Sequence, residues 1–199
     1  MASNFNEQTF STPLPPFQHG LYDPKFEKDS CGVGFIANIK GVKSHEIIKD
    51  GLQILLNLQH RGACGCDQET GDGAGILIQL PHKFFSEACS QLGLTLPESG
   101  SYGVAFAFLP KDATERTACE KAIEKLSKDT GLKFLGWRDV PVDSNSVGWL
   151  ARSQEPYMKQ AFIGKSAKSM TQDALETKLY IFRRKVENWS YSNAQPGMP

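Results

Sequence analysis

The sequence has no net charge and no long apolar run. Lysine plus arginine and aspartate plus glutamate each number 22 among 199 residues, so charge gives no reason to expect nucleic acid or an anionic membrane as a partner. No apolar stretch approaches the roughly 18 residues that can span a bilayer. The first seven residues lack the basic region and apolar core of a signal peptide, and the first lysine or arginine is Lys25, which argues against an arginine-rich transit peptide. These absences predict a cytoplasmic protein that binds neither nucleic acid nor membrane.

Cysteines are few and odd in number, and the chain carries no secretory feature that would favour disulfides. Free thiols are therefore predicted for all five, which are Cys31, Cys64, Cys66, Cys89 and Cys119. His60, Cys64 and Cys66 are close enough in sequence to suggest a metal site. However, a structural zinc needs four ligands, usually in two spaced pairs, and no second pair is present. Small buried residues are the favoured interpretation of Cys64 and Cys66, and no metal site is predicted.

Cys31 stands where a nucleophile could become the first residue of a chain. About thirty residues interrupted by four prolines precede it, and the apolar run GVGFIANI follows at once. If residues 1–30 were removed, the α-amine of Cys31, with an ordinary pKa of about 8, could act as the base for the thiol of the same residue. The alternative is a small buried residue at the start of a strand.

Two further blocks accompany CGVGF at residues 31–35, namely LQHRGACGCD at residues 58–67 and TGDGAGI at residues 70–76. Together the three blocks resemble the N-terminal glutaminase domain of the glutamate synthase large subunit, a class II glutamine amidotransferase. The resemblance extends from about Tyr22 to about Glu187. It implies an α+β fold, the four-layer αββα sandwich of N-terminal-nucleophile hydrolases, truncated at the C-terminal end. It divides the chain into a propeptide-like arm at 1–30, a partial amidotransferase domain at 31–187 and a divergent tail at 188–199.

The resemblance also implies roles for individual residues. Cys31 matches the catalytic nucleophile, and residues 1–30 match the removable propeptide. Arg61 matches the arginine that holds the α-carboxylate of the substrate, a task that suits the planar fork of a guanidinium. A solvated cation at a helix end is the alternative for Arg61. Gly62 permits a sharp turn after the helix, and Gly73 belongs to a glycine-rich loop that shapes the wall of the glutamine pocket.

The glycine-rich loop at residues 71–75 could also suggest a phosphate-binding loop. Nucleotide-binding loops of that kind lead into the N-terminus of a helix. Here the apolar run that follows predicts a strand instead, so a nucleotide site is disfavoured.

One family feature is absent. The family forms its oxyanion hole from an Asn-Gly pair and holds the substrate amine with an aspartate, both later in the domain, and no Asn-Gly dipeptide occurs in this sequence. Losing one oxyanion donor typically costs about 3 to 4 kcal/mol of transition-state stabilisation. The chain is therefore expected to be an incomplete domain with weak or no glutaminase activity.

The activity implied is hydrolysis of L-glutamine to glutamate and ammonia through a thioester on Cys31, the ammonia serving glutamate synthesis from 2-oxoglutarate. FMN and iron-sulfur clusters would belong to further domains, and no cofactor is expected in this segment. The implied partners are L-glutamine, the remaining synthase domains and a small electron-transfer subunit. Two alternatives remain open, a non-catalytic glutamine-binding or structural module and a different class II amidotransferase.

Apolar periodicity and turn residues predict a mixture of helices and strands without strict alternation. A helix is expected from Ser44 to about Arg61, and Trp137 and Trp149 are expected to pack inside the protein. The other expected helices follow Pro81, Asp112 and Thr171, and the expected strands span residues 32–39, 76–80, 102–109, 132–140 and 160–163.

Overall fold

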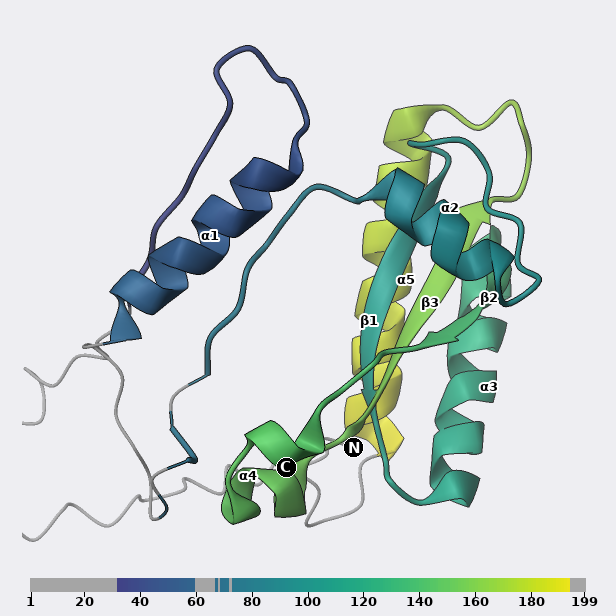
Figure 1. The fold of residues 1–199 in the computed structure, drawn as a ribbon. Helices are drawn as coiled ribbons and strands as arrows, with labels where there is room; N and C mark the ends of the chain where they lie inside the picture. The colour runs from purple at the N-terminus through teal and green to yellow at the C-terminus, as the bar shows by residue number, and fades with distance from the viewer. Residues whose placement is uncertain (1–31, 60–66, 68, 72, 194–199) are drawn as a thin grey trace, which may run out of the picture.

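The computed structural model describes residues 32–59, 67, 69–71 and 73–193 (Figure 1). In this part of the chain the elements follow the order α1 (His45–Asn57), α2 (His82–Ser90), β1 (Tyr102–Leu109), α3 (Ala113–Asp129), β2 (Leu132–Asp139), the 3-10 turn η3 (Ser144–Ser146), α4 (Trp149–Gln154), β3 (Tyr157–Lys165) and α5 (Gln172–Asn193). The predicted mixture of helix and strand is confirmed.

The three strands form one antiparallel sheet in the order β1-β3-β2. Because both outer strands pair antiparallel with β3, β1 and β2 run in the same direction and α3 connects them. The result is a split β-α-β unit with β3 inserted between its strands. A register shift between Phe134 and Gly136 interrupts the β2–β3 pairing.

Helices cover both faces of this sheet (Figure 1). Side chains alternate along a strand, so Ala161 and Ile163 of β3 share one face, where they pack with residues of α3 and α5. Phe162 faces the opposite side and packs with Phe85 and Cys89 of α2. The rings of Phe85 and Phe162 meet edge to face with centroids 5.2 Å apart, an arrangement that aromatic pairs favour. These two clusters make the described core.

The helix signals in the sequence act as expected around α3. Asp112 Oδ1 accepts hydrogen bonds from the backbone N–H groups of Thr114 (2.8 Å) and Glu115 (2.9 Å), which satisfies donors that the first turn leaves unpaired. Gly131 follows the end of α3 with φ of +71°, a left-handed conformation that glycine adopts at low cost.

The strands predicted at residues 32–39 and 76–80 are wrong, because neither segment is part of a sheet in the structure. Both are extended, and their apolar side chains are largely exposed, with Phe35 at 92% and Leu77 at 102%. A strand needs a neighbour for its backbone and a layer for its apolar face. Among the described residues neither segment pairs with another strand, although Leu80 packs against the cluster around Phe85 and Gly34 lies against α1.

Some side chains lie in other surroundings than predicted. Trp149 is 66% exposed, whereas Trp137 packs against the core as expected.

Candidate active site and its supporting loop

The predicted site residues fall mostly outside the part of the chain that the structure describes. Cys31, Arg61 and Gly62 are outside the described residues, as is the arm at 1–30. Gly73 is described and exposed, and nothing comes within 4 Å of the position that a Cβ would take. The structure describes the chain from Gly32 onward, up to Gln59 and again at Asp67, which are the nearest described residues to Cys31, Arg61 and Gly62.

The backbone directly after Cys31 lies against the last turns of α1. A Cβ added to Gly32 would be 3.1 Å from Leu58 Cδ1 and Cδ2, and one added to Gly34 would be 2.5 Å from Ile54 Cγ2. At Gly34 a side chain would overlap the helix, whereas at Gly32 the Leu58 side chain would have to shift slightly. Gly32 follows Cys31, and Leu58 precedes Arg61 by three residues. The contact therefore brings the residue after the predicted nucleophile next to a residue shortly before the predicted carboxylate ligand.

Side-chain hydrogen bonds fix the chain directly after Cys66, at Asp67 and Thr70. Asp67 Oδ2 accepts from the Thr70 hydroxyl (2.9 Å) and from the backbone N–H of Leu150 (3.3 Å), while its Oδ1 accepts from Glu69 N–H (3.1 Å). The backbone N–H of Ala151 donates to Thr70 Oγ1 at 3.4 Å. The turn at residues 67–70 thus binds the start of α4.

The contact with Asp67 and Thr70 supplies acceptors for the first N–H groups of α4. The first N–H groups of a helix have no partner inside it, and the N-cap residue, Gly148, has no side chain to accept from them. Asp67 and Thr70 supply the missing acceptors. In return the N–H of Gly148 donates to the Glu69 carbonyl at 3.3 Å.

Gly148 and the acidic side chain fit closely. A Cβ on Gly148 would overlap Asp67 Oδ1 and Thr70 Oγ1, so a larger residue would push the two loops apart.

Burial raises the pKa of Asp67, but the hydrogen bonds from Thr70, Leu150 and Glu69 outweigh this effect and hold the pKa below its ordinary value. The carboxylate therefore remains ionised, which strengthens the bonds that it accepts.

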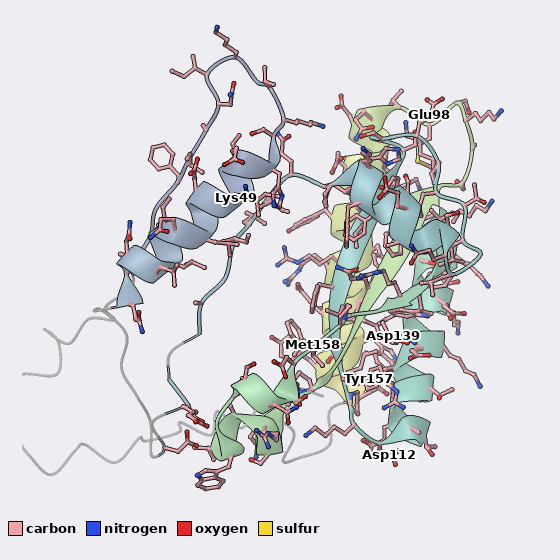
Figure 2. All side chains as sticks on the ribbon, in the orientation of Figure 1. Lys49, Glu98, Asp112, Asp139, Tyr157 and Met158 are labelled. Atoms are coloured by element: carbon pink, nitrogen blue, oxygen red, sulfur yellow. The ribbon has the colours of Figure 1, made fainter. Side chains whose placement is uncertain are left out.

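The helix α4 is in turn tied to the sheet. Lys111, two residues after β1, donates from Nζ to the carbonyl oxygens of Arg152 (3.0 Å) and Ser153 (3.5 Å). Ser144, in the 3-10 turn before α4, donates from Oγ to Oε1 of Glu155, the residue directly after α4, at 2.9 Å. Figure 2 shows that α4 lies at the end of the sheet where β3 begins at Tyr157.

The comparisons with known proteins now decide the family. The model of the class-II glutamine amidotransferases matches residues 31–197, and the match begins at Cys31. The chain belongs to this family. The resemblance found in the sequence is thereby confirmed.

Three relatives of the chain are all named as glutamate synthases. The chain is 43% identical over 174 residues to the glutamate synthase (NADPH) large chain of Bacillus subtilis, which covers 87% of the chain and 11% of that protein. It is 38% identical over 189 residues to the glutamate synthase (NADH) of Schizosaccharomyces pombe, covering 88% and 9%. It is 39% identical over 184 residues to ferredoxin-dependent glutamate synthase 1, chloroplastic/mitochondrial, of Arabidopsis thaliana, covering 92% and 11%. The chain spans about a tenth of the length of these relatives.

The two cysteines that the structure describes are free, as predicted for them. Cys89 is a buried residue of α2, and Cys119 belongs to α3 on the other face of the sheet. Burial raises the pKa of both thiols, which keeps them protonated and unreactive. Among the described residues no three histidine, cysteine or acidic side chains are grouped to bind a metal ion, and His60, Cys64 and Cys66 lie outside them. Within the same residues no helix is long and apolar enough to cross a membrane.

The contact of Asp67 and Thr70 with α4 was not predicted from the sequence. Asp67 and Thr70 stood inside the quoted blocks, yet only their neighbours were given roles. An aspartate three residues before a threonine is a turn signal, since the carboxylate can accept from the groups that follow it. That signal would have predicted the turn at 67–70. It could not have predicted α4 as the partner.

Proposed function

We propose that the chain is the glutaminase part of a glutamate synthase, with Cys31 as its N-terminal nucleophile. The family match that begins at Cys31 carries this proposal, because removal of the preceding residues would leave a cysteine that holds both thiol and base. The names of the relatives support the assignment to glutamate synthase rather than to another class II enzyme. The contact of Gly32 with Leu58 supports a shared site for Cys31 and Arg61.

The proposed reaction has two steps. The α-amine of Cys31 takes the proton of the thiol, and the thiolate attacks the side-chain carbonyl carbon of glutamine. The protonated amine then gives this proton to the leaving nitrogen, so that ammonia departs and a thioester remains. Water then attacks the thioester carbon, which releases glutamate and restores the thiol. Arg61 pairs with both oxygens of the α-carboxylate and fixes the amide near the thiol. Gly62 and Gly73 leave room for the substrate beside these groups.

We further propose that the full domain has the four-layer sandwich of N-terminal-nucleophile hydrolases. The exposed apolar side chains of the two extended segments support this, since Val33, Phe35 and Ile39 alternate along one and Ile76 to Ile78 form the other. A second sheet would bury them at about 25 cal/mol per Å² of apolar surface.

The likeness to glutamate synthase implies FMN and iron-sulfur clusters. An iron-sulfur cluster does not fit the cysteines that the structure describes. A cluster needs about four cysteine thiolates in one place, and Cys89 and Cys119 lie on opposite faces of the sheet with raised pKa values. We place such groups in other domains of the whole protein, where ammonia would combine with 2-oxoglutarate. A small electron-transfer subunit and a cytoplasmic location remain predictions, and the Arabidopsis relative is named chloroplastic/mitochondrial.

Labelling with an electrophilic glutamine analogue, a diazoketone, tests the function. We expect intact-mass and peptide analysis of the natural protein to find the label on Cys31 of a chain that begins there. Glutamine should protect Cys31, whereas asparagine, one methylene shorter, should not. Cys31→Ala is the control and should take up no label. Glutamine binding without any label on Cys31 would instead favour the non-catalytic module, and labelling that glutamine does not slow would overturn the proposal.

A further inference from the structure

The strand β1 is an outer strand of the described sheet, with β3 as its neighbour on one side. The N–H of Lys165 donates to the carbonyl oxygen of Ser101, the residue before β1. In an antiparallel pair every second pair of residues exchanges hydrogen bonds, so the backbone groups of Gly103, Ala105 and Ala107 face β3. The backbone groups of the residues between them face the open edge, and these residues are Tyr102, Val104, Phe106 and Phe108.

The open edge of β1 lacks the features that normally keep an outer strand from pairing. Such strands carry lysine or proline, or they contain a bulge. The other outer strand, β2, has Lys133, Arg138 and a register shift between Phe134 and Gly136. By contrast β1, with the sequence YGVAFAFL, has no charged residue and no proline, and its register with β3 is unbroken. Thus β2 has the features of a natural edge, and β1 has those of an inner strand.

Apolar side chains are exposed beside this edge on one face of the sheet. Phe106 and Phe108 point to the same face as Tyr102 and Val104, which pack in the cluster with α2. Their rings contact each other with centroids 5.1 Å apart, yet Phe106 is 48% and Phe108 67% exposed. A neighbouring strand would cover both rings by cross-strand contacts.

A groove of about 880 Å³ borders β1 and α5. The small side chains of Ala105 and Ala107 line it, and so do Tyr180 and Tyr191, which are exposed on α5. Side chains of a strand point alternately to the two faces of a sheet. A strand beside β1 would therefore place one set of side chains over the exposed phenylalanines and the other set over this groove. The edge fits an extended segment that is apolar on both faces.

We propose that the polypeptide following α5 adds a fourth strand to this edge, antiparallel to β1. Helix α5 runs along β1 in the same direction. A Cβ on Gly100, before β1, would be 3.7 Å from Gln172 at the start of α5, and one on Gly103 would be 2.8 Å from Leu179. The helix therefore ends toward the end of β1 (Figure 1). A chain that leaves α5 there needs only a short connection to return along the open edge.

The hand of the connections selects the edge at β1 over the edge at β2. Connections between parallel strands of one sheet are nearly always right-handed. The helices α3 and α5 pack on the same face of the sheet, and β3 runs opposite to β1. A connection from β3 through α5 thus has the same hand as β1-α3-β2 only if it crosses the sheet in the opposite direction. That direction leads to the free edge of β1, where the new strand would complete a second split β-α-β unit.

The relatives have the polypeptide that such a strand requires. The chain spans about a tenth of the length of these glutamate synthases, and the strand is proposed for a protein of that length. A second copy of the chain, pairing β1 with β1, is the rival occupant, but it would make no use of the direction of α5. Neither the proposal nor its test depends on glutaminase activity.

Photo-crosslinking of the natural full-length protein identifies the occupant. The photoreactive residue benzoylphenylalanine would replace Phe106 or Phe108, whose exposed rings it resembles in shape. We expect adducts with the segment that follows α5. The adduct from position 108 should lie nearer to α5 in the sequence, by about two residues, because an antiparallel strand passes Phe108 before Phe106. The same probe at Lys133, on the other outer strand, is the control and should give no adduct with that segment.

Hydrogen exchange of the unsubstituted full-length protein, read at single residues, gives a second measurement that does not depend on how the probe variants fold. The N–H groups of Val104, Phe106 and Phe108 should be protected at least about tenfold relative to unstructured amides, as should those of Ala105 and Ala107. Protection of the two alanines alone would show an open edge and overturn the proposal. Adducts that join two molecules, adducts elsewhere in the chain, or adducts in the reverse order would overturn it as well.

Discussion

The contact between the segment after Cys31 and helix α1 makes a sharp prediction. In Gly34→Ala the new Cβ would be 2.5 Å from Ile54 Cγ2, about 1 Å closer than carbon atoms normally approach. Overpacking of this size costs typically about 1 to 3 kcal/mol. We expect Gly34→Ala to lower the free energy of unfolding by this amount and to slow labelling of Cys31 by the glutamine analogue, because the nucleophile segment must move off the helix.

A compensating change separates this steric cause from any other. Ile54→Leu removes the Cγ2 methyl while keeping the side-chain volume, so the double variant Gly34→Ala with Ile54→Leu should recover most of the loss. The assay is urea unfolding followed by circular dichroism, in a double-mutant cycle whose coupling energy should be about 0.5 to 3 kcal/mol. A harmless Gly34→Ala, or a loss that Ile54→Leu does not relieve, would refute the reasoning that these two residues lie in contact.

Three further predictions follow from the same structure. Asp112→Ala removes the acceptor of two N–H groups at the start of α3 and should destabilise the protein by about 1 kcal/mol in urea unfolding, while Asp112→Asn should lose much less. Gly51→Ala lies in the middle of α1 with only Ile76, at 4.0 Å, near the new methyl, and it should stabilise the protein by about 0.5 to 1 kcal/mol. A loss of stability there would show that α1 packs more tightly than described. The pKa of Asp67, measured by NMR titration, should lie below its ordinary value and rise in Thr70→Val. Since the folded pKa is the lowered one, the hydrogen bonds that Asp67 accepts from Thr70, Leu150 and Glu69 should be complete above the ordinary pKa. They should be lost as pH falls through the folded value.

Local signals in the sequence predicted the elements whose causes are local. A helix was predicted to follow Asp112, and α3 begins at the next residue with Asp112 as its cap. The strand predicted at residues 160–163 is confirmed, although it is longer than predicted, from Tyr157 to Lys165. Its outer residues include Lys159, whose ion pair with Glu120 of α3 cannot be read from apolar spacing.

Features that depend on distant residues were predicted poorly. The runs at 32–39 and 76–80 have the composition of strands, but strand formation depends on neighbours that spacing does not reveal. Helix α4 has only six residues and no apolar period, so nothing marked it. The acceptors that stabilise its start lie about eighty residues earlier, at Asp67 and Thr70. The three motif blocks, by contrast, were enough to predict the family and Cys31 as the candidate nucleophile.

The most direct test of the account is to trap the covalent intermediate. The natural protein would be mixed with glutamine, quenched in acid within its first turnover and digested for mass spectrometry. We expect a glutamyl thioester on a peptide whose first residue is Cys31. Cys31→Ala should give neither the adduct nor ammonia. Ammonia release by a chain that retains residues 1–30, or by Cys31→Ala, would contradict the claim that Cys31 is an N-terminal nucleophile.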